Sequence, residues 1–360
     1  MPVTTTPPML RAGLLALRCG TTSWQLGLDP AHAVLLRGVD AGCARGLQAL
    51  DRRHYPHADP ADVALLGTAL LAQLDRLGLL ASGRTSVAAR PGSARTRARR
   101  QGELVAAAVL HREDPLPRRR RQRVAVCGSG PVPALLAAGL AQAGVGTVAV
   151  LGRGRPVVAC DLTVAGPRAG DLGRPWNEAV ADVVRELGAQ TTLVGGRPHV
   201  AVLTDTVDAD LPWCDPQHGD EWLRRGVPHL PVIAAGGGAQ VGPLVLPGRT
   251  ACLHCEELAL VERDRHRPAL TLGLRELARS GARAGLPVAA SLAALAASHG
   301  VVRTLEVLDG VAEPTGTRLL LRLPDASADV DPIAPHPTCG CRWGEGGRTM
   351  GPWTTFPGAR

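Results

Sequence analysis

The sequence predicts an α/β protein whose larger part is a doubly wound sheet of parallel strands, preceded by a small α+β domain. Three observations carry this prediction. Apolar segments typical of buried strands alternate with helical patterns from Arg123 onward. A glycine turn joins the first of those strands to a helix. Short alternating segments and two helical patterns occupy the first 82 residues. Strands that alternate with helices are typical of parallel sheets covered on both faces.

The small first domain is expected over residues 1–82. Three short segments of alternating character are predicted to be strands: 14–20, 23–28 and 33–39. Residues 60–80 then repeat apolar side chains at helical spacing, so they are predicted to form one helix. This combination resembles a winged helix. The helix carries only Arg76 against Asp62 and Asp75, so a DNA-reading role is not expected.

An arginine-rich linker is expected over residues 83–122. The net charge of the chain is +8, and residues 84–123 alone hold 12 arginines and three acids, which leaves −1 for the rest. A solvated linker explains this run, and a tether for an anionic partner is the alternative. The chain contains no lysine and only one Tyr and one Phe, so base-stacking surfaces for nucleic acid are not expected.

The main body is expected over residues 123–345, followed by a tail at 346–360. Residues 123–152 read as strand, glycine turn, helix, glycine turn and strand. The pattern continues with a helix at 177–188, a strand at 199–205, a helix and strand within 219–237, a long helix at 287–308 and a strand at 317–325. This order predicts a Rossmann-like body.

The glycine turn is the first candidate site. Gly128, Ser129 and Gly130 follow a strand and open a helix, where backbone N–H groups can bind phosphate. Pro133 stands where a third glycine is usual. The next strand ends without an acid to hold a ribose, and the first acid is Asp161. A vestigial nucleotide site and a plain tight turn both remain open, and an NAD(P) site is the weaker alternative.

Four cysteines form the second candidate site. Cys252 and Cys255 have zinc-knuckle spacing, and Cys339 and Cys341 form a tighter pair near the end of the chain. Zinc in structural sites takes four thiolates in a tetrahedron. The sequence therefore predicts one structural zinc, with His254 and His336 beside the pairs as substitutes or supporting groups. A site filled by four protein ligands keeps no position open for catalysis.

The remaining cysteines and the lengths of the apolar segments lead to two further expectations. Cys127 and Cys160 lie beside apolar strands and are predicted to be ordinary core residues, while Cys214 near His218 leaves a nucleophile as an alternative. No apolar run approaches the roughly 18 residues that span a bilayer. The six-residue apolar patch between Arg11 and Arg18 is too short for a signal-peptide core. A cytoplasmic protein without membrane association is expected.

The order of these motifs resembles the ThiF/MoeB/HesA superfamily of ubiquitin-activating-like proteins over about residues 121–345. The most specific parts are "GPLVLPGRTACLHC" at 242–255 and "HPTCGC" at 336–341. With the first domain included, the chain resembles the ThiF-like partner proteins of ribosomal-peptide maturation clusters. Those proteins bind the leader of a precursor peptide and present the peptide to a YcaO-type cyclodehydratase.

The resemblance implies a set of nucleotide contacts. Active members adenylate a C-terminal carboxylate with ATP and magnesium. By position, Gly128 and Gly130 match the phosphate loop, Arg174 the arginine and Asp205 the metal-binding aspartate. The ribose acid and the lysine near the phosphates have no counterpart here. Arginine does not replace a compact ammonium well, and phosphoryl activation depends mainly on such placed charge.

Two functions follow from the resemblance. The first is a non-catalytic scaffold that binds a precursor leader peptide and supports a partner cyclodehydratase, with a structural zinc and a possible homodimer. The second is an ATP-dependent adenylyltransferase with altered nucleotide contacts. The sequence favours the scaffold, because two charged elements and the third glycine are missing.

Overall fold

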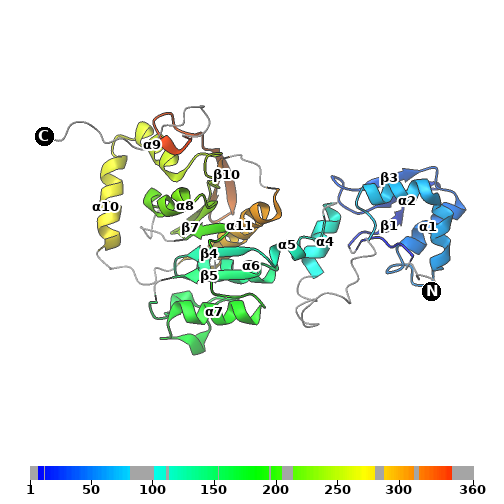
Figure 1. Ribbon diagram of the computed structural model, residues 1–360, viewed down its shortest axis with the longest axis horizontal. Coiled ribbons are helices and arrows are strands. Elements are labelled where there is room, and N and C mark those ends of the chain that lie inside the picture. Colours follow the sequence, from blue (N-terminus) through cyan, green and yellow to red (C-terminus); the bar gives the residue numbers. More distant parts are fainter. Residues whose placement is uncertain are drawn as a thin grey trace. The chain divides into compact units, whose positions relative to one another are not determined.

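The computed structural model describes residues 7–342, except for residues 12, 82–100, 111–112, 153, 194–195, 205–213, 280–287 and 312–315. The chain divides into two compact units, residues 1–118 and 119–360. Figure 1 shows the helices and strands of both units along the chain. The division falls inside the arginine-rich residues 83–122 that the sequence assigns to a linker.

The first unit begins with a three-stranded antiparallel sheet. Its strands, in the order β1-β2-β3, are β1 (Ala16–Arg18), β2 (Ser23–Leu26) and β3 (Val34–Arg37). All three lie inside segments that the alternating pattern predicts. Trp24 and Leu26 turn their side chains into the core, whereas Leu17 and Leu35, on either side of Gln25, are 39% and 47% exposed.

Helices complete the first unit. They are α1 (Ala41–Leu50), the 3₁₀ helix η1 (Pro60–Leu66), α2 (Gly67–Arg76), α4 (Gln101–Val109) and the short α5 (Leu116–Arg119) at the division. The single helix predicted over 60–80 is divided, because Gly67 has a φ of 69° and ends the first segment. Asp51 binds the sheet to α1: its Oδ2 accepts a hydrogen bond from the Ala16 amide at 2.9 Å.

The second unit is built on a seven-stranded sheet with the order β10-β9-β8-β7-β6-β4-β5. Four neighbouring strands are parallel, as predicted: β4 (Arg123–Cys127), β5 (Thr147–Leu151), β6 (Val200–Leu203) and β7 (His229–Ala235). Their residues are almost all buried, which is typical of parallel strands covered on both faces.

The prediction of an all-parallel sheet is wrong for the other three strands. These are β8 (Gly238–Val241), β9 (Thr317–Arg322) and β10 (Ser327–Pro332), and each pairs antiparallel to its neighbour. The physical reason is the two-residue turn at Gly236 and Gly237, which returns the chain directly into β8 instead of into a crossover helix. The body is therefore a mixed sheet.

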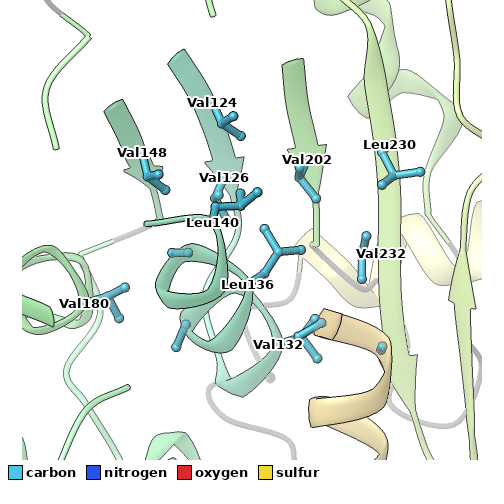
Figure 2. Close-up of a cluster of buried hydrophobic side chains, with 14 of the residues drawn as sticks. Val124, Val126, Val132, Leu136, Leu140, Val148, Val180, Val202, Leu230 and Val232 are labelled. Carbon is cyan, nitrogen blue, oxygen red and sulfur yellow. The ribbon is translucent and has the colours of Figure 1, made fainter. Parts of the chain in front are cut away.

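Helices cover both faces of this sheet. The helices of the second unit are α6 (Pro131–Gln142), α7 (Trp176–Glu186), α8 (Asp220–Arg224), α9 (Leu253–Arg263), α10 (Arg267–Arg279) and α11 (Ala290–Asp309). Figure 2 shows Val124, Val148 and Val202 on three parallel strands, with Leu136 and Leu140 of α6 among them. On the opposite face, Ala125 and Ile233 pack with Trp222 and Leu253 in a separate cluster.

A buried ion pair fixes the start of the second unit. The Arg119 guanidinium donates to both carboxylate oxygens of Asp309, at the end of α11, at 2.9 and 2.6 Å. Its remaining nitrogen donates to the Ala143 carbonyl at 3.1 Å. Among the described residues, no helix is long and apolar enough to cross a membrane.

Candidate functional site

The four predicted zinc ligands come together in the structure. Their Sγ atoms all lie within 4.8 Å of one another. The Sγ–Sγ distances are 3.8 Å for Cys252 and Cys255, 3.6 Å for Cys252 and Cys339, and 3.3 Å for Cys255 and Cys341. A tetrahedral zinc with bonds of about 2.3 Å requires sulfurs about 3.8 Å apart. The donor set and its spacing therefore fit a zinc ion.

Local structure places the first thiol pair at the start of a helix. Cys252 is the N-terminal cap residue of α9, and Cys255 lies in its first turn. The preceding loop is held by Thr250, whose hydroxyl accepts from the Leu246 amide at 2.8 Å and donates to the Leu244 carbonyl at 3.0 Å. Because only two residues of the helix start separate the two cysteines, both thiols face the centre of the cluster.

The second thiol pair lies on a tight turn at the other end of the unit's sequence. Gly340–Arg342 form a short 3₁₀ helix, and the Cys339 amide donates to the His336 carbonyl. The hydrogen bond from Cys252 lowers the pKa of the Cys255 thiol, while burial raises that of Cys341. The pKa values of these two thiols therefore differ, and a bound metal would favour the thiolate form of both.

The side chains of the two neighbouring histidines bind carboxylates. His254 Nε2 lies 2.6 Å from Asp220 Oδ1. His336 Nε2 lies 2.9 Å from Glu262 Oε1. The sequence left these histidines open as substitute ligands or supporting groups, and the backbone of His336 supports the cluster through a hydrogen bond to Cys255.

The glycine turn has the geometry of a loop that opens a helix. β4 ends at Cys127, and Gly128 and Gly130 have φ angles of 133° and 129°, which favour glycine. Pro131 then starts α6 in the first turn, where a missing N–H costs no helical hydrogen bond. Ser129, the middle residue of the loop, faces the segment that follows β5.

A side chain that the sequence analysis did not select contacts this loop. Arg155 Nε donates to Ser129 Oγ at 3.1 Å. The same guanidinium binds both carboxylate oxygens of Asp161 at 2.6 Å. Asp161 is completely buried and also accepts from the Val158 amide. The sequence signal was present in "GRGRP" followed by "CD", but only the fold shows that the two residues meet.

The other predicted nucleotide residues do not meet the loop in the described part of the chain. The Arg174 side chain binds Asp171 at 2.6 Å and Asp182 at 2.8 Å, and it is 43% exposed beside α7. Asp205 lies outside the described residues. β6 ends at Leu203, and Thr204 Oγ1 donates to the Cys127 carbonyl at the end of β4.

A cavity of about 450 Å³ lies beside α9 and the β8–β9 strands. Its walls carry paired charges: Arg318 binds Glu256 at 2.5 Å, and Arg267 binds Glu257 at 2.9 Å. Burial raises the pKa of Glu256, against the effect of Arg318. Cys214, the nucleophile alternative, is buried here, and its Sγ contacts the Asp215 carbonyl at 3.7 Å.

Comparison with solved structures gives clear matches for the fold. MccB of E. coli with ATP has a TM-score of 0.65 at 13% identity, covering 93% of this chain and 99% of that chain. The microcin C7 biosynthetic enzyme MccB in complex with N-formylated MccA matches with a TM-score of 0.61 at 13% identity and the same coverage. PaaA matches with 0.64 at 16% identity, covering 89% of this chain and 99% of that chain.

These matches, at 13% and 16% identity, show that this chain shares the fold of MccB and PaaA. Residues 119–360 are only two thirds of the chain, so a match over 93% also includes most of residues 1–118. No family model matches the sequence. No curated protein matches it by sequence either.

Proposed function

We propose that this protein is a ThiF-like scaffold that binds the leader of a ribosomally made precursor peptide. The observation that carries the proposal is the match over 93% of the chain to MccB, which has been solved in complex with the MccA peptide. The first unit has its own core and a small sheet, both within residues 1–82. We assign these residues, as a winged-helix-like domain, to peptide capture.

The sheet of the first unit offers main-chain and apolar contacts. β3 is an outer strand, and an extended peptide can pair with such an edge. The outer edge of β1 is occupied at Ala16, whose amide and carbonyl bind Asp51 and Tyr55. Leu17 and Leu35 leave apolar surface on its outer face. Leader peptides are disordered when free, so pairing with the four-residue strand β3 would order only a short stretch of the leader.

The second unit then serves as the body of the scaffold. We propose one structural zinc at the four cysteines, a partner cyclodehydratase of the YcaO type, a homodimer as in related proteins, and action in the cytoplasm. Support comes from the spacing of the four thiols and from a glycine loop that is bound by the chain's own Arg155. The arginine-rich residues 83–122 would join the two functions as a tether.

Adenylation of a peptide carboxylate is the second candidate. The glycine loop at the start of α6 favours it, as does the match to MccB with ATP. The lack of any lysine and of an acid at the end of β5 opposes it. An NAD(P)-binding body is the least supported candidate for the same reason.

The test uses the full-length protein and, as probes, synthetic peptides that cover any short open reading frames beside its gene. Fluorescence anisotropy of the labelled peptide should give saturable binding. Leu35→Asp, which places a charge on the outer face of the sheet, should weaken binding at least about tenfold, because apolar contact and desolvation are both lost. Leu172→Asp is the matched control, an exposed leucine in the second unit that should leave binding unchanged. Equal binding by both variants would show that the peptide does not bind to this sheet.

A further inference from the structure

The space beside the glycine loop contains several side chains of this chain. One is Arg155, whose guanidinium makes four hydrogen bonds: one to Ser129, two to Asp161 and one to the Pro156 carbonyl. Arg155 is only 16% exposed and Asp161 is fully buried. A bidentate, charge-assisted pair of this kind is geometrically specific. The middle of the loop is therefore connected to a fixed point in the core.

The second contact lies at the end of β5. Gly152 is the first residue after this strand, which is where dinucleotide-binding folds carry the acid that holds a ribose. A Cβ atom at Gly152 would lie 2.8 Å from the Gly128 carbonyl oxygen and 3.0 Å from the ring of Trp176. Trp176 is completely buried at the start of α7. The backbone of the loop and an indole ring therefore fill the position of an acidic side chain.

The Arg155 hydrogen bond and the Gly152 packing involve different residues, and both act on the loop of residues 128–130. Arg155 holds Ser129 from the side of the β5–α7 connection, and Gly152 packs directly against Gly128. To free Arg155 from Asp161 would leave a buried carboxylate without its charge partner, which is costly. An anion that binds Arg155 at the loop therefore competes with its hydrogen bond to Ser129, while Asp161 keeps the guanidinium in place.

We propose that the Arg155–Asp161 pair is a clasp that closes the glycine loop, while Trp176 against Gly152 fills the adjacent ribose position. The chain thus closes its own nucleotide site, and the loop serves as a structural turn between β4 and α6. This inference deepens the non-adenylating part of the proposed function and rests on it there. Peptide binding by the first unit is independent of it.

The experiment follows hydrogen exchange of the amides of residues 128–130 in the full-length protein, with and without millimolar Mg·ATP. In the wild type, Mg·ATP should leave the exchange unchanged. Arg155→Ala should speed exchange of these amides about tenfold, because the charge-assisted hydrogen bond from Arg155 to Ser129 no longer opposes local opening. Arg275→Ala is the matched control, since it also removes an arginine that binds both carboxylate oxygens of a buried aspartate, Asp215, outside the loop.

A second variant covers the case in which Arg155→Ala does not fold. Arg155→Lys keeps the charge but loses the bidentate geometry, and it should speed exchange by a smaller factor. Two results would overturn the proposal. One is unchanged loop exchange in both Arg155 variants. The other is protection of the loop by Mg·ATP in the wild type that Arg155→Ala abolishes, which would make Arg155 a phosphate ligand. The leader-binding assay stays unaffected in either case, so failure here is distinguishable from failure of the scaffold proposal.

Discussion

The four-cysteine cluster and the glycine loop both join segments that are distant in the sequence, and they differ in what fills their centre. At the cluster, Cys252 and Cys255 face Cys339 and Cys341 at distances that suit a central ion. At the loop, Ser129 faces Arg155, which Asp161 already holds. The cluster has the donor groups for a ligand, whereas the loop is satisfied by the chain itself.

The two sites would therefore contribute differently to stability. A zinc ion held by the four cysteines would fasten the terminal segment to α9, and its removal would affect the whole second unit. A nucleotide contact contributes only when a nucleotide binds, so its charged groups can be lost without loss of the fold.

The cluster should lose its metal when one thiol is replaced. Cys255→Ser should abolish zinc binding and lower the free energy of unfolding by about 4 kcal/mol or more, because metal binding at a closed thiolate site is coupled to folding. Metal analysis and chemical denaturation measure both effects. Cys19→Ser, at an exposed cysteine outside the cluster, is the control and should change neither. A wild type purified under reducing conditions without any zinc would contradict the assignment.

The clasp should contribute strongly to stability. Arg155→Ala should lower the free energy of unfolding by about 3 kcal/mol, because it leaves the buried Asp161 carboxylate without its ion pair. Urea denaturation measures the change. Arg174→Ala should change stability little, since its partners are solvated. Equal effects of the two substitutions would show that the loop contact is an ordinary surface pair.

Residue 152, where the ribose-binding acid is missing, should not tolerate a side chain. Gly152→Ala should destabilise the protein by about 1–3 kcal/mol, because the new Cβ would press on the Gly128 carbonyl and on Trp176. Gly170→Ala is the control, with open space around its Cβ position. Thermal denaturation compares the two. If Gly152→Ala is as stable as Gly170→Ala, the ribose position is not filled.

A buried histidine should make stability depend on pH. Burial lowers the pKa of His229 below its ordinary value of 6.5, and its Nδ1 lies 3.0 Å from the Val227 carbonyl. Below pH 6.5 the unfolded state therefore binds a proton that the folded state does not. This contribution is fully present above pH 6.5 and falls by at most about 1.4 kcal/mol per pH unit below it. His229→Gln should remove that slope from the difference between urea titrations at pH 5.5 and 7.0, and an unchanged slope would contradict it.

Much of the second unit could be predicted from the sequence. The run Arg123–Cys127 and its glycine turn predicted a strand and helix that the structure contains. The two thiol pairs predicted a cluster that forms over a separation of more than 80 residues. Both signals are local, since each depends on residue types at short spacing.

Other features depend on contacts that no local pattern carries. The antiparallel strand β10 has exposed residues at nearly every position, so it lacks the alternation that marks a strand. Arg155 and Asp161 are only six residues apart, but whether they meet at Ser129 depends on how the β5–α7 connection folds over α6. The same holds for Trp176, which occupies the space beside Gly152 only in the folded chain.

The most direct test of the central claim is an ATP–pyrophosphate exchange assay on the zinc-loaded, full-length protein with its precursor peptide present. We predict one zinc per chain in that preparation and no exchange above the protein-free background, because Arg155 binds the loop and Trp176 fills the ribose position. Robust exchange that depends on the peptide and is abolished by Asp205→Ala would contradict it. That result would make this protein an adenylating enzyme with an unusual nucleotide site.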